Sequence, residues 1–259
     1  MRRILSRMRQ AEPDVRSYAV THRNGQLILP QAEQWDQLIY SAHGAVTVHT
    51  GLGSWVVPPH RAVWVPGGVG HRIDVAGRTS LRTLYFAARL QALPARCQVI
   101  AVSRLLRELI LHAVATAPLY LSDLRHSHLV AVLVDLLDSV APDPALQLPA
   151  PAEPRARALA DLLRSHHSEP ITALASLAGA SRRTLERLFL AETGMTIGEW
   201  RRRLRMLEAL RLLADGRAVS WVAGAVGYST PSAFSTAFRA ELGSSPAQYL
   251  RSTTSARQG

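Results

Sequence analysis

Apolar residues change their spacing along this chain. Between residues 26 and 86, seven short runs rich in β-branched and aromatic residues are separated by glycines and prolines. Such runs are typical of antiparallel strands, and their regular spacing predicts a small β-barrel or jelly roll. The runs cover residues 26–29, 37–40, 45–49, 54–57, 62–65, 71–75 and 81–86.

From residue 103 onward the apolar spacing becomes helical. Residues 103–114 and 121–140 each predict a helix. The second carries a strongly apolar stripe made of Leu129, Val130, Val132, Leu133, Leu136 and Leu137. Such a stripe needs a partner, which is either this chain's own barrel and neighbouring helix or a second copy of the chain. The Pro-rich segment 142–154 then predicts a semi-rigid connection between two domains.

One pattern occurs twice in the last hundred residues. Residues 175–189 and 223–238 each contain a small residue, then Gly179 or Gly227, then the hydroxyl residue Ser181 or Thr230. A glycine supplies the positive φ of a tight turn, and a hydroxyl residue caps the helix that follows. The repeat therefore predicts two helix-turn-helix units.

Both second helices have an apolar face and an opposite, exposed face. The inward residues are Leu185, Leu188, Phe189, Phe234, Ala237 and Phe238. The outward residues are Arg183, Glu186 and Arg187 in the first unit and Ser232, Ala233 and Thr236 in the second. This spacing is that of helices entering a DNA major groove. The alternative is a pair of ordinary helical hairpins in an α-helical core.

A single long helix is predicted between the two units. The capping box at residues 196–199 begins it, and Asp215 with Gly216 ends it. About 18 residues span roughly 27 Å, which suits two recognition helices one DNA turn, about 34 Å, apart. Arg201, Arg202, Arg203 and Arg205 lie along this helix, where they either reach phosphates or form a solvated face. The residues expected to contact phosphates or cap helices are Ser181, Arg182, Arg201, Arg202 and Thr230.

These motifs resemble the DNA-binding domain of the AraC/XylS transcription regulators. The match includes residues 181–189, 192–194, 199–201, 226–229, 232–234, 237–238 and 243–246. The resemblance implies a sequence-specific DNA-binding regulator that reads bases with the two outward trios. Thr236 stands where the family often has Arg, which implies weaker base reading by the second unit.

The barrel region is similar to a cupin sensor of the same regulators. Residues 66–71 match the second cupin motif, and residues 37–44 keep the spacing of the first. Where cupins carry metal-binding His and carboxylate residues, this chain has Gln31, Glu33 and Gln37, so only His71 remains. One imidazole, one carboxylate and two amides form a poor ligand set for a transition metal. We therefore expect no metal, no cofactor and no catalytic residues.

Aromatic residues are concentrated in the predicted barrel, so it is a candidate site for a small, partly planar effector. The expected pocket residues are Glu33, Trp35, Gln37, Tyr40, Trp64 and His71. The alternative is that these side chains only fill the core, since the strand register decides which of them face inward.

The sequence thus predicts an α+β fold with five parts. They are a flexible basic arm (1–14), a cupin-like sensor domain (15–95), a helical dimerisation segment (96–141), the Pro-rich linker (142–154) and an AraC-type DNA-binding domain (155–259). The expected partners are double-stranded DNA, an unidentified effector and a second copy of the chain, with RNA polymerase as a further candidate. The alternatives are a metal-dependent cupin enzyme with a helical appendage and a constitutive DNA binder with a vestigial barrel.

Composition agrees with this picture. The 259 residues can form two domains, and the net charge of +11 suits a polyanionic partner. No lysine occurs, so all 30 basic residues are arginines. Cys97 is alone, which excludes an intrachain disulfide and fits a reducing compartment. No long apolar run predicts a membrane span or a secretory signal, so we expect a soluble, cytoplasmic protein.

Overall fold

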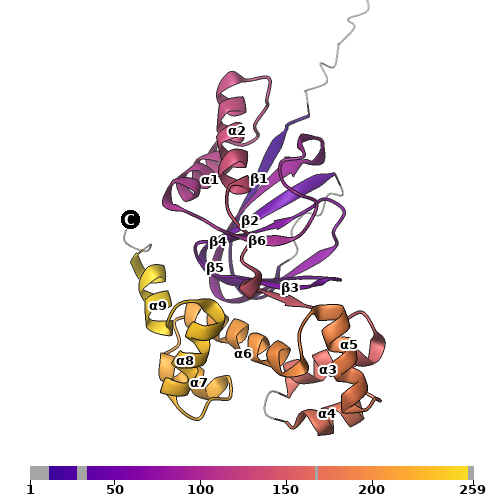
Figure 1. Cartoon of the computed structure of the whole chain (residues 1–259). Helices are drawn as coiled ribbons and strands as arrows, with labels where there is room; N and C mark the ends of the chain where they lie inside the picture. Colours follow the sequence, from indigo (N-terminus) through magenta and orange to yellow (C-terminus); the bar gives the residue numbers. More distant parts are fainter. Residues whose placement is uncertain (1–11, 28–33, 167–168, 256–259) are drawn as a thin grey trace, which may run out of the picture.

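The computed structural model describes residues 12–27, 34–166 and 169–255. It has the predicted α+β architecture: an antiparallel, barrel-like sheet is followed by two helices on its side and then by a helical C-terminal domain (Figure 1). The strands are β1 (Val15–Leu27), β2 (Trp35–Thr50), β3 (Gly53–Val57), β4 (Arg61–Val65), β5 (His71–Ala87), β6 (Gln98–Ala101) and β7 (Gln147–Pro149). Their order is β1-β5-β2-β3-β7, and β4 pairs with both β2 and β6.

The strands are longer than the sequence pattern predicted. Residues 37–40 and 45–49 belong to the single strand β2, and residues 71–75 and 81–86 belong to β5. Gly44, read as a break, lies instead at a bulge inside β2, with a φ of +74°. A Cβ there would lie only 2.7 Å from the carbonyl oxygen of Arg78. The glycine therefore bends a continuous strand rather than ending it.

The two faces of the sheet are buried against different partners. Ile39 packs inside the sheet with Val63 and Val65. Leu38 and Tyr40, which alternate with Ile39 along β2, belong to a second cluster on the opposite face. Helices α1 (Arg104–Thr116) and α2 (Leu124–Asp138) cover that opposite face (Figure 1). Because strand side chains alternate with a period of two, this register assigns every β2 residue to one face or the other.

Helices α1 and α2 lie where the apolar spacing predicted them, and Ser103 and Asp123 cap their N-termini. Within the apolar stripe of α2, Val130, Leu133 and Leu137 are buried against the sheet and α1. Val132 remains 46% exposed. Leu129 and Leu136 are partly buried against the same cluster, so five of the six stripe residues find their partner in their own chain.

The predicted linker and domain limits differ from the structure. Strand β7 lies within the Pro-rich segment and pairs with β3, and β6 pairs with β4 beyond residue 95. The sheet therefore extends beyond residue 95, the predicted end of the sensor domain, and includes part of the predicted linker 142–154. Residues 1–11 of the predicted arm lie outside the described residues. At its end, the backbone N–H of Asp14 donates to the Leu119 carbonyl at 2.9 Å.

The C-terminal domain is built around one long helix, α6 (Ile197–Ala214), which begins with the predicted capping box at Thr196. The other helices are α3 (Pro154–Ser165), α4 (Ile171–Leu177), α5 (Arg182–Thr193), α7 (Val219–Ala225), α8 (Pro231–Leu242) and α9 (Pro246–Ser255). Helices α3 to α5 gather at one end of α6, and α7 to α9 gather at the other (Figure 1). Helices α3 and α9 were not predicted. No helix in the described part of the chain is long and apolar enough to cross a membrane.

The sheet packs directly on α6. The indole Nε1 of Trp200 donates a 2.8 Å hydrogen bond to the carbonyl oxygen of Pro149, and the Trp200 ring meets Phe189 edge to face. At the C-terminal end of α6, Asp215 approaches Gly77 of β5 so closely that a Cβ atom at Gly77 would overlap the Asp215 carboxylate. Side chains of the barrel and of the C-terminal helices therefore belong to one continuous apolar cluster.

Candidate nucleic-acid interface

The first helix-turn-helix unit consists of α4 and α5. Gly179 supplies a φ of +73° at the turn, and the Ser181 hydroxyl accepts the Thr184 backbone N–H at 3.2 Å. Leu185 and Phe189 are fully buried. The apolar side of α5 therefore faces the core, and its other side is left to solvent, as the spacing predicted.

The outward trio of α5 does not behave as one set. Arg183 and Arg187 are exposed, as is Arg182. Glu186 is half-buried: its carboxylate accepts the backbone N–H of Ile197 at 3.2 Å and lies 3.6 Å from Arg182. Since the first turn of α6 carries unsatisfied N–H groups, this contact holds α5 against the start of α6. Glu186 is thus placed to position the helix, whereas Arg183 and Arg187 remain exposed to solvent.

The second unit, α7 and α8, has the same construction. Gly227 has a φ of +83°, and the Thr230 hydroxyl accepts the Ala233 backbone N–H at 3.2 Å. Phe234 and Phe238 are fully buried. The predicted trio Ser232, Ala233 and Thr236 is exposed. The Thr236 hydroxyl donates to the Ser232 carbonyl at 3.2 Å, so it is already engaged within α8.

The arginines of α6 separate into different roles. Arg202 is exposed, whereas Arg201 is half-buried. The pKa of Arg201 is lowered mainly by burial and to a smaller extent by the nearby charge of Arg205. Arg203 donates to Glu241 of α8 at 2.7 Å and to the Pro144 carbonyl at 3.4 Å. Arg203 therefore joins three segments of the protein, and Arg202 is the one exposed arginine among these four residues of α6.

The two units lie at opposite ends of α6, and the sheet lies along a different side of that helix (Figure 1). The 18 residues of α6 span roughly 27 Å. Together with the widths of the helices packed at each end, this length is compatible with one turn of DNA, about 34 Å. Helices α5 and α8, each with an exposed face, are therefore held apart by the length of α6.

The predicted effector residues do not gather at one place. Trp35 and Gln37 share the face of β2 that carries Ile39, but Tyr40 and Trp64 lie on the opposite face beneath α1 and α2. The prediction that these four share a pocket was wrong, because the register places them on two sides of the sheet. His71 starts β5 with its Nδ1 3.0 Å from the Val69 carbonyl oxygen, and Glu33 lies outside the described residues.

A different polar group lies on the inner face. Register places Gln37 opposite Tyr85 and Ile39 opposite Thr83, so Gln37, Thr83 and Tyr85 point to the same side. One polar atom of each side chain is buried and has no hydrogen-bond partner among the described residues: Oε1 of Gln37, Oγ1 of Thr83 and the hydroxyl oxygen of Tyr85. Burial raises the pKa of Tyr85 to about 12. Thr83 was not anticipated, because only the pairing of β2 with β5 reveals its position.

Two further features concern metal binding and the reactivity of the Cys97 thiol. Across the described ranges, no three or more His, Cys, Asp or Glu side chains are grouped so that they could hold a metal ion. Burial raises the pKa of the Cys97 thiol to about 11. That thiol is therefore protonated, and weakly nucleophilic, near neutral pH.

Comparison with known proteins places this architecture in a family. A family model described as a helix-turn-helix domain matches residues 174–252. The HTH-type transcriptional regulator NimR of Escherichia coli K12 is 34% identical over 236 residues, which cover 90% of this chain and 82% of NimR. A putative AraC-like transcription regulator of Streptomyces antibioticus is 39% identical over 86 residues, or 33% of this chain and 28% of that protein.

Among solved structures, the DNA-binding domain of AdpA in complex with a target DNA is 37% identical. It covers 41% of this chain and 98% of the AdpA domain, with a TM-score of 0.38. The nearly full-length likeness to NimR, together with the two helix-turn-helix units, shows the family. The chain belongs to the AraC-type family of helix-turn-helix transcriptional regulators.

Proposed function

We propose that this regulator binds duplex DNA with α5 and α8 in successive major grooves. The observation that carries this proposal is that both helices keep an exposed outer face while α6 holds them at opposite ends of one domain. Arg183 and Arg187 would contact base edges, for which a guanidinium is suited because it donates two parallel hydrogen bonds to guanine. The site of action is then the chromosome, in the cytoplasm.

The remaining contacts would position the protein. Ser232, Ala233 and Thr236 present short, uncharged side chains, which suits close approach to bases more than strong discrimination. Arg182 and Arg202 would contact phosphates, and Arg201 could join them from its half-buried place. The helix N-termini capped by Ser181 and Thr230 also direct backbone N–H groups toward a phosphate.

We further propose that the barrel binds a small effector on its inner face. Gln37, Thr83 and Tyr85 present buried polar atoms within an apolar wall, which is how protein pockets orient small molecules. An effector would act by binding one arrangement of the barrel and the C-terminal helices better than another. No catalytic role is proposed, since the relatives are named as transcription regulators.

The DNA proposal is tested by selecting sites from a random duplex library with the full-length chain. We expect the selected duplex to bind at least about 10³-fold more tightly than a scrambled duplex at the same salt concentration. An RNA duplex of the selected sequence should behave like the scrambled one, because its major groove is too narrow for a helix. Equal affinity for all three would refute sequence-specific DNA recognition.

The effector proposal is tested on the selected duplex with a metabolite collection. A true effector should shift both the melting temperature of the protein and its DNA affinity, and Gln37→Leu should remove the response. If no compound changes either quantity, the chain is a constitutive DNA binder with a vestigial barrel.

We also propose a homodimer formed through the outer face of α2, where Leu124 is 71% and Val132 is 46% exposed. Replacing Val132 by Arg would place a charge in a desolvated interface, and we expect the dimer to dissociate in sedimentation experiments. The matched control is Leu52→Arg, which adds the same charge at a 69% exposed apolar position outside α2. An unchanged mass for Val132→Arg would exclude this face.

A further inference from the structure

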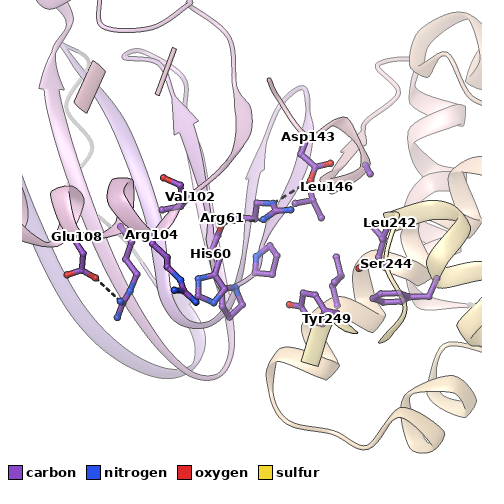
Figure 2. Close-up of a pocket in the computed structure, with 17 residues that line it drawn as sticks. His60, Arg61, Val102, Arg104, Glu108, Asp143, Leu146, Leu242, Ser244 and Tyr249 are labelled. Atoms are coloured by element: carbon purple, nitrogen blue, oxygen red, sulfur yellow. Dashed lines mark hydrogen bonds and ion pairs between the residues drawn. The ribbon is translucent and has the colours of Figure 1, made fainter. Parts of the chain in front are cut away.

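Residues 144–153, which we call the strap, lie between the barrel and α6. They comprise the short 3-10 helix Pro144–Leu146, strand β7 and the residues that lead into α3. On the barrel side, β7 pairs with β3. Just before the strap, Asp143 pairs with Arg61 of β4 at 3.5 Å (Figure 2). One side of the strap therefore belongs to the barrel.

The other side of the strap lies along the N-terminal half of α6. Trp200 donates to the Pro149 carbonyl at 2.8 Å, and Arg203 donates to the Pro144 carbonyl at 3.4 Å. Residues three apart in a helix lie on the same face, so both contacts come from one face of α6. The later strap residue meets the earlier helix residue. The strap therefore runs antiparallel to α6.

The last turn of each recognition helix holds one end of the strap. Glu192 of α5 accepts the Ala152 and Glu153 backbone N–H groups on one carboxylate oxygen, at 2.7 and 3.1 Å. Glu241 of α8 accepts from Arg203 at 2.7 Å, and Arg203 also donates to the start of the strap. The side chains of Arg203 and Glu241 are 25% and 16% exposed, so solvent screens this pair less than it screens a surface pair.

Glu192 and Glu241 occupy equivalent positions in the two helix-turn-helix units. Glu192 follows the buried Phe189 by three residues, and Glu241 follows the buried Phe238 by three. A carboxylate in the last turn of a helix is unfavourable, because the helix dipole is negative there. Contacts outside the helix must offset that cost, and in both units the strap provides them.

We propose that Glu192 and Glu241 are positioning residues, which fix the orientation of α5 relative to α8 by holding the strap. Helix α6 alone connects the two units along one line, about which each unit can tilt. The strap is a second connection beside α6, and it resists that tilt. The effect on DNA binding rests on the proposed function, whereas the effect on helix orientation does not.

Spin labels on the two recognition helices test the orientation without DNA. Leu190 and Arg239 are exposed positions of α5 and α8, and a Cys at each in a Cys97→Ala chain takes one label. We expect double electron–electron resonance to give one narrow distance distribution. Glu192→Ala combined with Glu241→Ala should broaden it. Glu192→Gln combined with Glu241→Gln should not, because an amide oxygen still accepts both sets of hydrogen bonds. Circular dichroism checks that both variants keep the helix content of the parent.

Three duplexes test the consequence for DNA: the selected site, the same site with one inserted base pair, and the first half-site alone. The insertion rotates the second half-site by about 35°, so it should weaken binding by the parent. The double Ala variant should bind the selected duplex about fivefold more weakly than the parent, and the insertion should weaken its binding less. Its affinity for the single half-site should equal that of the parent.

The matched control removes two carboxylates away from the strap. Glu12→Ala combined with Glu108→Ala makes the same change in net charge at side chains that are 60% and 64% exposed. It should leave the distance distribution and the insertion penalty unchanged. Loss of negative charge by itself strengthens binding to a polyanion, so weaker binding by the double Ala variant is the opposite of a net-charge effect.

An equally narrow distance distribution in the double Ala variant would overturn the inference. An equal loss of affinity for the selected duplex and for the single half-site would show that the glutamates act within one unit instead of between two. If the distribution broadens but the insertion penalty stays that of the parent, the role in DNA binding is wrong. Absence of sequence-specific binding by the parent would refute the proposed function and leave the distance measurement to decide the role of the strap.

Discussion

At the scale of single residues, the two recognition helices are unequal. Arg183 and Arg187 on α5 are exposed and long enough to reach base edges. On α8, the Thr236 hydroxyl already donates to the Ser232 carbonyl, and Ala233 offers only a methyl group. We therefore expect the first unit to supply most of the base discrimination.

Arg187→Ala should weaken binding to the selected duplex by roughly 1–3 kcal/mol and relax the preference at one base pair. Thr236→Ala should cost less than about 1 kcal/mol, because a hydroxyl engaged within its own helix has little to lose. Titrations against duplexes substituted at single positions measure both effects, with Arg125→Ala as the control. An equal loss for Arg187→Ala on every sequence would make Arg187 a phosphate contact instead.

Sequence spacing identified the exposed arginines but not the role of Glu186. Helical periodicity places Glu186 on the outer stripe, yet its carboxylate accepts the Ile197 backbone N–H of the next helix. That partner is set by how two helices meet, which no periodicity within one helix encodes. In the same way, the spacing of Trp35, Gln37, Tyr40 and Trp64 could not show that strand register divides them between two faces.

At the scale of secondary-structure elements, helices were predicted better than strands. Caps and turn glycines are local signals, and those at Ser181, Thr196 and Thr230 mark the true starts of α5, α6 and α8. Strand limits depend instead on pairing. Gly44 resembles a break in the sequence, but the neighbouring β5 continues past it and the bulge keeps β2 intact. Strands β6 and β7 are short and are defined only by their partners β4 and β3.

The contact between α6 and the sheet gives an element-scale prediction. Trp200→Phe keeps an aromatic ring against Phe189 but removes the 2.8 Å hydrogen bond to Pro149, leaving a partly buried carbonyl oxygen with one partner fewer. We expect a loss of about 0.5–1.5 kcal/mol in the free energy of unfolding, measured with urea. Trp221, which is 52% exposed on α7, provides the control, since Trp221→Phe should change stability by less than about 0.5 kcal/mol. A Trp200→Phe protein as stable as its parent would show that this bond does not hold α6 to the sheet.

At the scale of the whole molecule, the barrel and the C-terminal helical domain share one apolar cluster instead of being joined by a free linker. The Pro-rich segment predicted as that linker contributes β7 to the sheet and the carbonyl that Trp200 contacts. Length and composition predicted a chain of two domains. Composition could not predict how the barrel and the helical domain pack together, because this packing depends on individual contacts such as the close approach of Gly77 to Asp215.

The central claim is that α6 holds α5 and α8 at a fixed separation on successive turns of one DNA duplex. The most direct measurement is the affinity of the full-length chain for its selected duplex before and after about five base pairs, roughly half a helical turn, are inserted between the half-sites. We predict that affinity falls to that of a duplex carrying only the half-site of the first unit, because the second half-site then faces the opposite side of the helix. Unchanged affinity for the lengthened duplex would contradict the account.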